Sequence, residues 1–153
     1  MELVVVSDNH GRIEPLNEIR NRYPEASAYI HCGDSELPPE SLDGFVSVMG
    51  NNDYFYDYPN QLILNIDGIK ILVVHGHRFS FVNRLSQIVS LANKNDCRIV
   101  CYGHTHIYDY RVVNGITIVN PGSLWRSRDG SKPSYAVIEI NDNIISVTKK
   151  TID

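Results

Sequence analysis

The sequence has no long apolar run and few cysteines, and both shortages narrow the classes of protein it can belong to. No uncharged apolar stretch approaches the roughly 20 residues that a membrane-spanning helix needs, so we expect no membrane segment. The amino terminus enters the apolar segment 3–6 without a basic region or a cleavage site, so we expect no signal peptide. The cysteines Cys32, Cys97 and Cys101 are odd in number and lack metal-site or redox spacing. They indicate reduced thiols and a cytoplasmic protein.

An excess of positive charge is also missing. The chain carries 14 Lys and Arg residues against 18 Asp and Glu residues, a formal net charge of −4. A nucleic-acid ligand usually requires a basic face that neutralises phosphates. We therefore expect a small soluble substrate and no nucleic-acid partner.

The sequence contains no internal repeat, low-complexity tract or domain linker. Its 153 residues are 42% hydrophobic, which suits one domain over residues 1–153 with a real core.

Short β-branched runs, each ending in a polar cluster, dominate the chain. Such runs fit strands buried on both faces. They cover residues 3–6, 28–30, 45–49, 70–74, 98–102 and 116–119.

Segments with helical spacing of apolar residues separate some of these runs, and the pattern changes to antiparallel strands near the end of the chain. Pro15 opens a predicted helix that ends near Pro24, and a second helical period extends from about Ser80 to Asn95. The segments 108–113, 116–119, 135–140 and 144–149 resemble antiparallel strands, with Asn114-Gly115 as a tight hairpin turn. The chain is therefore α/β first and mostly β at its end.

The histidines gather in the polar clusters at the strand ends. Five of the six do so: His10, His75, His77, His104 and His106. Open α/β sheets bind their ligands at the carboxyl ends of strands. Alternate residues of an extended chain face the same side, so Asp8 and His10 can share one site, as can His104 and His106. Mixed imidazole, carboxylate and amide ligands suit Mn²⁺, Fe²⁺, Zn²⁺ or Ni²⁺ better than Ca²⁺.

The ordered motifs resemble those of the calcineurin-like metallophosphoesterases. They are Asp8-x-His10, Gly33-Asp34, Gly50-Asn51-x-Asp53, His75 and Gly103-His104-x-His106. The short length, the His-Gly-His at 75–77 and the Asn-Pro-Gly-Ser at 120–123 are similar to the small single-domain microbial phosphodiesterases of this family.

The resemblance implies a fold, a metal site and a reaction. The fold is an α/β four-layer sandwich of two mixed β-sheets flanked by helices. Two divalent ions per chain are implied, for which we expect Mn²⁺ with Ni²⁺, Fe²⁺ or Zn²⁺ as alternatives. A metal-bound hydroxide would attack a phosphodiester in line with the leaving group.

The resemblance also implies the ligands. One ion is expected on Asp8, His10, Asp34 and His106, and the other on Asp34, Asn51, His75 and His104, with Asp34 bridging.

One departure from the larger family members concerns Asn52, which stands where they have a histidine. Asparagine donates a hydrogen bond but is no general acid at neutral pH, which favours phosphodiesters with good leaving groups over phosphomonoesters. Asn52 and His77 are the predicted catalytic residues that contact the phosphoryl oxygens; for His77 a helix-capping role is equally consistent with the sequence.

For several other residues the sequence allows a structural interpretation beside a functional one. His31 is predicted to be a buried, hydrogen-bonded histidine. The segment Tyr54–Tyr58 is either an aromatic wall for a nucleoside or aryl group, a packing patch or a contact in a homodimer. Arg126, Arg128 and Lys132 either steer phosphate or are simply solvated.

Two rival functions also remain. One is a catalytically silent scaffold, like the retromer subunit that has this fold, although every expected ligand position is filled here. The other is an enzyme with a different substrate, a phosphomonoesterase or a nuclease.

Overall fold

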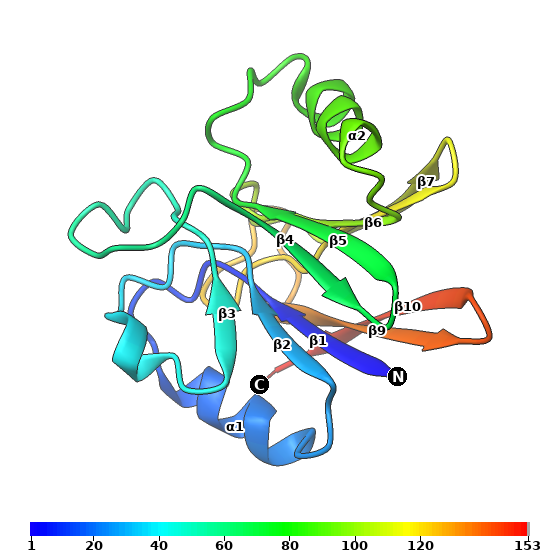
Figure 1. Cartoon of the computed structure of the whole chain (residues 1–153). Coiled ribbons are helices and arrows are strands. Elements are labelled where there is room, and N and C mark those ends of the chain that lie inside the picture. The colour runs from blue at the N-terminus through cyan, green and yellow to red at the C-terminus, as the bar shows by residue number, and fades with distance from the viewer. Residues whose placement is uncertain (153) are drawn as a thin grey trace.

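Two five-stranded sheets pack face to face in the structure, a computed structural model that describes residues 1–152 (Figure 1). Sheet A has the order β10 (Ile144–Thr151), β9 (Ser134–Asn141), β1 (Glu2–Val6), β2 (Ala28–His31) and β3 (Phe45–Ser47). Sheet B has the order β4 (Gln61–Ile66), β5 (Ile69–Val74), β6 (Ile99–Cys101), β8 (Ile116–Asn120) and β7 (Asp109–Val113).

Both sheets are mixed. In sheet A, β1, β2 and β3 are parallel, and β9 joins β1 antiparallel. In sheet B, β5, β6 and β8 are parallel, flanked by antiparallel β4 and β7. The carboxyl ends of the parallel strands therefore lie at one edge of each sheet.

The continuous apolar runs are explained by burial on both faces. Leu3 and Val5 of β1 join the core between the sheets, whereas Val4 and Val6 pack with Leu16 of helix α1 (Glu14–Arg22) on the outer face of sheet A. Helix α2 (Arg84–Lys94) covers the outer face of sheet B. The predicted four-layer α/β sandwich is confirmed, with one short 3₁₀ helix at Pro39–Ser41. No helix within residues 1–152 is long and apolar enough to cross a membrane.

The predicted hairpin at Asn114-Gly115 is present, and a similar one was missed. Asn114 and Gly115 both have positive φ, 52° and 78°, as the tight hairpin turn requires. Asp67 and Gly68, with φ of 52° and 85°, make the equivalent turn between β4 and β5. The alternation of Leu62, Leu64 and Ile66 before Asp67-Gly68 is the sequence signal for β4.

The predicted start of the second helix is wrong. The helix begins at Arg84, not near Ser80. Phe81 and Val82 are 85% and 86% exposed, so they bury little surface although their spacing suits a helix. Residues 81–83 form a turn instead, and the Ser80 N–H donates to the Gln87 side-chain oxygen at 3.0 Å.

Candidate metal centre

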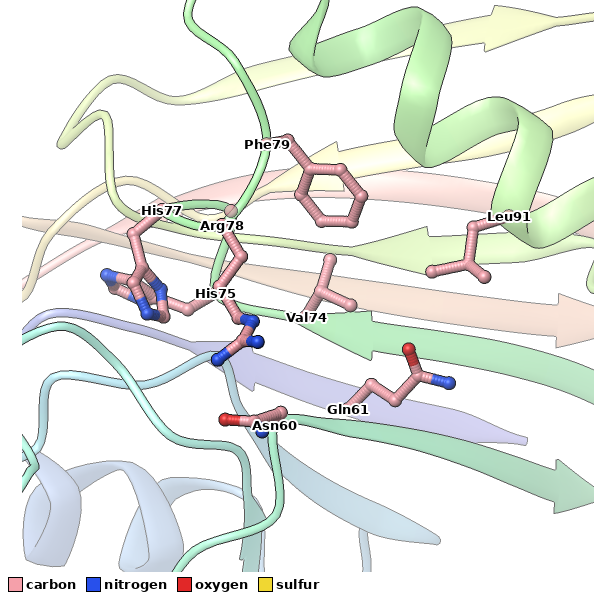
Figure 2. A pocket seen from close by; sticks show the side chains of 9 residues that line it. Asn60, Gln61, Val74, His75, His77, Arg78, Phe79 and Leu91 are labelled. Carbon is pink, nitrogen blue, oxygen red and sulfur yellow. The ribbon is translucent and has the colours of Figure 1, made fainter.

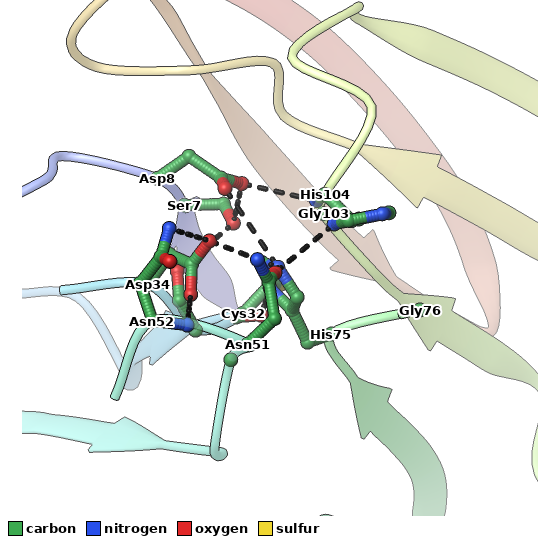
Figure 3. Close-up of polar contacts among 12 residues, drawn as sticks. Ser7, Asp8, Cys32, Asp34, Asn51, Asn52, His75, Gly76, Gly103 and His104 are labelled. Atoms are coloured by element: carbon green, nitrogen blue, oxygen red, sulfur yellow. Dashed lines mark hydrogen bonds and ion pairs between the residues drawn. The ribbon is translucent and has the colours of Figure 1, made fainter. Parts of the chain in front are cut away.

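The seven predicted metal ligands meet where the parallel strands of both sheets end, and Figure 3 shows five of them: Asp8, Asp34, Asn51, His75 and His104. Sheet A supplies them after β1, β2 and β3, and sheet B after β5 and β6: Asp8 and His10, Asp34, Asn51, His75, and His104 and His106.

A first group of side chains combines Asp8, His10 and His106. Asp8 Oδ1 lies 3.3 Å from His106 Nε2 and 3.7 Å from His10 Nε2. The two imidazole nitrogens are 3.1 Å apart. Three ligand atoms thus converge on one point.

A second group combines Asp8, Asp34 and His75. His75 Nε2 lies 3.3 Å from Asp34 Oδ2 and 3.8 Å from Asp8 Oδ1. Asn51 Oδ1 extends this group, at 3.1 Å from His75 Nε2 and 3.2 Å from His104 Nδ1.

The carboxylate of Asp8 belongs to both groups. Its Oδ2 accepts hydrogen bonds from the Ser7 hydroxyl and the His104 backbone N–H. Its Oδ1 is fully buried and accepts none from residues 1–152. A buried carboxylate oxygen without a partner is costly, and a cation between the two groups would satisfy it. Asp34, the residue expected to bridge, belongs to the second group only.

Electrostatics keep this carboxylate ionised. Burial alone would raise the pKa of Asp8, but the nearby imidazoles of His106 and His75 together hold it below its ordinary value. The pKa of Asp34 is likewise lowered against burial, by the His75 imidazole whose Nε2 lies 3.3 Å from Asp34 Oδ2. The centre therefore presents two anionic carboxylates, as a divalent cation requires.

Two imidazoles are turned so that Nε2 faces the centre. The Nδ1–H of His75 donates to the Cys32 carbonyl at 2.7 Å, and that of His106 donates to the Arg126 carbonyl at 2.9 Å. These acceptors fix the tautomer and leave Nε2 as a ligand atom.

His10 is oriented differently, by a residue that the sequence did not reveal. Its Nδ1 lies 2.7 Å from Glu36 Oε2. Glu36 stands 26 residues away in the sequence, so no local motif pointed to it.

Backbone strain is concentrated here. Five of the predicted ligands have φ between 44° and 72°, in the left-handed region: Asp8, His10, Asp34, His104 and His106. Non-glycine residues rarely adopt it, and such residues cluster at functional sites.

Two glycines precede ligands because the chain passes close to the centre. A Cβ on Gly50 would lie 2.1 Å from Asp34 Oδ1, and one on Gly103 would lie 2.1 Å from Ser7 Oγ. The glycines of the Gly-Asn and Gly-His motifs are therefore required, because a side chain does not fit at either position. Asp53 secures the same region, since its carboxylate accepts the backbone N–H groups of Asp34, Glu36 and Gly50 at 2.7–2.9 Å.

A hollow of about 530 Å³ opens over the ligands. Its lining consists of His10, Asp34, Glu36, Asn51, Asn52, His104, His106, Trp125 and Arg128. Asn52 donates its side-chain amide to Asp34 Oδ2 at 3.3 Å. Trp125, like Glu36, was not anticipated from the sequence.

His77 lies beside this hollow and lines a smaller one of about 240 Å³. Figure 2 shows His75 and His77 at one end, with Phe79 and Leu91 farther along. The His77 ring centroid is 6.3 Å from that of His104, and its Nδ1 is buried without a partner among residues 1–152. Burial lowers the pKa of His77.

The structural interpretation of His31 is confirmed. It is fully buried, its Nδ1 accepts the Gly33 N–H at 3.0 Å, and its Nε2 pairs with Asn9 Oδ1 at 2.7 Å. Burial lowers its pKa to about 4.

The aromatic segment Tyr54–Tyr58 does not line the hollow. Tyr58 is buried, whereas Tyr54 and Phe55 are 72% and 78% exposed and stack on each other. The turn at 120–123 is structural, since Asn120 donates to the Gly103 carbonyl and Ser123 Oγ to the Asp8 carbonyl.

Comparison with known proteins identifies the class. The model of the calcineurin-like phosphoesterase superfamily domain matches residues 1–143, and the chain belongs to that superfamily. It is 34% identical to a probable metallophosphoesterase of Bacillus subtilis, YsnB, over 96% of this chain and 89% of that protein. It is 25% identical to the phosphodiesterase MJ0936 of Methanocaldococcus jannaschii, over 80% of this chain and 83% of that protein.

Solved structures agree. A Streptococcus pneumoniae protein described as a predicted phosphoesterase superposes with a TM-score of 0.92 at 32% identity, over 98% of this chain and 88% of that one. A single mutant of Vps29 from Entamoeba histolytica superposes with a TM-score of 0.77 at 21% identity over 100% of both chains, a likeness in fold alone. The family predicted from the sequence is confirmed.

Proposed function

We propose that this protein is a two-metal phosphodiesterase that acts on small substrates. The observation that carries the proposal is Asp8 Oδ1, a fully buried carboxylate oxygen that belongs to both groups of ligand atoms and has no hydrogen-bond partner among residues 1–152. One anionic oxygen shared by two groups suits a pair of ions that share a ligand.

The predicted ligands fit divalent ions in their chemistry. Asp8, His10, Asp34 and His106 would hold one ion, and Asp34, Asn51, His75 and His104 the other, with Asp8 Oδ1 within reach of both groups. Bound ions would lower the pKa of a water and neutralise the phosphate. The donor set suits Mn²⁺, our expectation, and equally Ni²⁺, Fe²⁺ or Zn²⁺.

Residues around the hollow would position the substrate. Asn52 uses one amide hydrogen on Asp34, and its other hydrogen is available to a phosphoryl oxygen. His77 would donate a hydrogen bond to a phosphoryl oxygen from the side on which His75 lies. Since Asn52 cannot protonate a leaving group, phosphodiesters with good leaving groups are favoured. The relative named a phosphodiesterase supports the same choice.

The scaffold alternative shares the fold, as the likeness to Vps29 illustrates. Two observations favour the enzyme: the filled ligand positions and the hollow of about 530 Å³ that leads to them. A buried carboxylate oxygen that has no hydrogen-bond partner among residues 1–152 is costly unless a cation pairs with it.

The test compares bis-p-nitrophenyl phosphate with p-nitrophenyl phosphate, using chelated protein before and after Mn²⁺, Ni²⁺, Fe²⁺ or Zn²⁺ is added. We expect metal-restored turnover that is faster for the diester. Faster turnover of the monoester would indicate a phosphomonoesterase. Folded protein, checked by circular dichroism, without turnover in any ion would indicate the scaffold.

A further inference from the structure

The single tryptophan of the chain lies in the wall of the hollow. Its ring centroid is 5.1 Å from that of His10 and 6.4 Å from that of His106, in edge-on arrangements. Trp125 is nevertheless 40% exposed. The hollow therefore offers a large aromatic surface directly beside the predicted ligands.

Hydrogen bonds connect this tryptophan to the metal centre. The Trp125 backbone N–H donates to Ser123 Oγ at 3.0 Å, and that hydroxyl donates to the Asp8 carbonyl at 2.7 Å. Leu124, between them, is 1% exposed, and its N–H donates to the Ser7 carbonyl at 3.1 Å. The backbone that carries the indole is thus held against Asp8, and the ring lies edge-on to His10 and His106, so little entropy is lost when a ligand contacts it.

Two arginines bring positive charge near the indole, and the Glu36 carboxylate in the same lining is negative. The Arg126 guanidinium carbon lies 5.0 Å from the indole centroid, and Arg128 also lines the hollow. A flat ring attached to an anionic phosphate matches this surface, because the ring can stack while the phosphate meets positive charge.

We propose that Trp125 is a specificity-determining residue that stacks on an aromatic substituent of the phosphodiester, the substituent that stays on phosphorus after hydrolysis. The proposal rests on the proposed function and narrows its substrate class to diesters with an aryl or nucleobase ring. The proposal also assigns to Trp125 the stacking role that the sequence suggested for Tyr54–Tyr58.

The experiment holds the leaving group constant and varies the retained substituent. The substrates are the methyl, phenyl and thymidine 5′ esters of p-nitrophenyl phosphate. In each, water adds to phosphorus, the bond to the p-nitrophenyl oxygen breaks, p-nitrophenolate is released and one proton of the water passes to the solvent. The bond that breaks is the same throughout, and each substrate has one intrinsic reactivity in wild type and variants, so a change in the ratio of kcat/KM values between them reports contacts with the retained group.

We expect wild-type protein to prefer the phenyl ester over the methyl ester by about tenfold in kcat/KM, the usual size of one stacking contact. Trp125→Leu should reduce that ratio to about one, and Trp125→Phe should keep part of it. Phe55→Leu, which changes an exposed aromatic outside the hollow, should keep the wild-type ratio. A thymidine ester that matches or exceeds the phenyl ester would identify a nucleobase as the ring; phenyl alone would identify an aryl group.

An equal ratio in wild type and Trp125→Leu, or a ratio lost in Phe55→Leu instead, would overturn the proposal. A binding measurement separates this failure from failure of the proposed function. Because Trp125 is the only tryptophan, its fluorescence should be quenched by diphenyl phosphate and not by dimethyl phosphate in metal-loaded protein. Absence of hydrolysis with quenching would refute only the proposed function, whereas hydrolysis without quenching by diphenyl phosphate would refute only the role of Trp125.

Discussion

The two sheets contribute different ligand atoms to the candidate metal centre. Sheet A brings the oxygen donors Asp8, Asp34 and Asn51 together with one imidazole, His10, whereas sheet B brings imidazoles only. Neither sheet alone presents a complete set. The centre therefore forms only when the sheets pack through the core that Leu3, Val5 and their neighbours make between them, and metal binding should be coupled to that packing.

The largest effect is expected from the carboxylate that both groups share. Asp8→Asn keeps the shape of the side chain but removes the charge, so we expect kcat/KM for the diester to fall on the order of 10³-fold and both ions to be lost. His75→Ala, in sheet B, should lose one ion and remain folded. Metal analysis of purified protein distinguishes the two variants.

Asp57→Asn, at an exposed position, is the matched control and should behave as wild type. If Asp8→Asn retained as much metal as this control, the shared carboxylate would not be a ligand.

A second difference between the sheets concerns protonation. His75 of sheet B faces Asp34 and Asp8, which together raise its pKa against the opposing effect of burial. His31, at the end of β2 in sheet A, has a pKa lowered to about 4, chiefly by burial. Between its ordinary value of about 6.5 and about 4, the unfolded chain binds a proton that the folded chain does not.

Stability should therefore fall by roughly 3 kcal/mol from this residue as pH decreases through that window. Urea unfolding of chelated protein at several pH values in the window measures the slope of the unfolding free energy against pH. In His31→Gln the loss of free energy across the window should be smaller by the same roughly 3 kcal/mol, so the slope should be shallower. An unchanged slope in the variant would show that His31 is protonated in the folded chain.

The smallest effect concerns how the imidazoles are oriented. The sheet B residues His75 and His106 donate to backbone carbonyls, whereas His10 of sheet A pairs with the Glu36 carboxylate. Glu36→Gln keeps a hydrogen-bond acceptor but removes its charge, so affinity for one ion should weaken by about 10- to 100-fold. Calorimetric titration with Mn²⁺ measures this.

Glu40→Gln, in the exposed 3₁₀ turn, is the control for that experiment and should bind Mn²⁺ as wild type does. Equal Mn²⁺ affinities in the two variants would mean that Glu36 does not affect metal binding by His10.

The sequence by itself determined every strand except β4, the chemistry at the strand ends and the family. Continuous Val and Ile runs require burial on both faces, and parallel strands carry the residues at their carboxyl ends to a common edge, so Asp34 and His104 could be expected to approach each other. The glycines before Asn51 and His104 also indicated the site, because no Cβ fits at either position.

Only the tertiary structure decided which other side chains reach that edge. Glu36 and Trp125 lie in irregular segments, and His77 lines the smaller hollow instead of the main one. Helical spacing at Phe81 likewise did not produce a helix, because that residue is 85% exposed and joins no core cluster among residues 1–152. Local patterns record which faces are buried, whereas contacts between distant loops depend on how the two sheets pack.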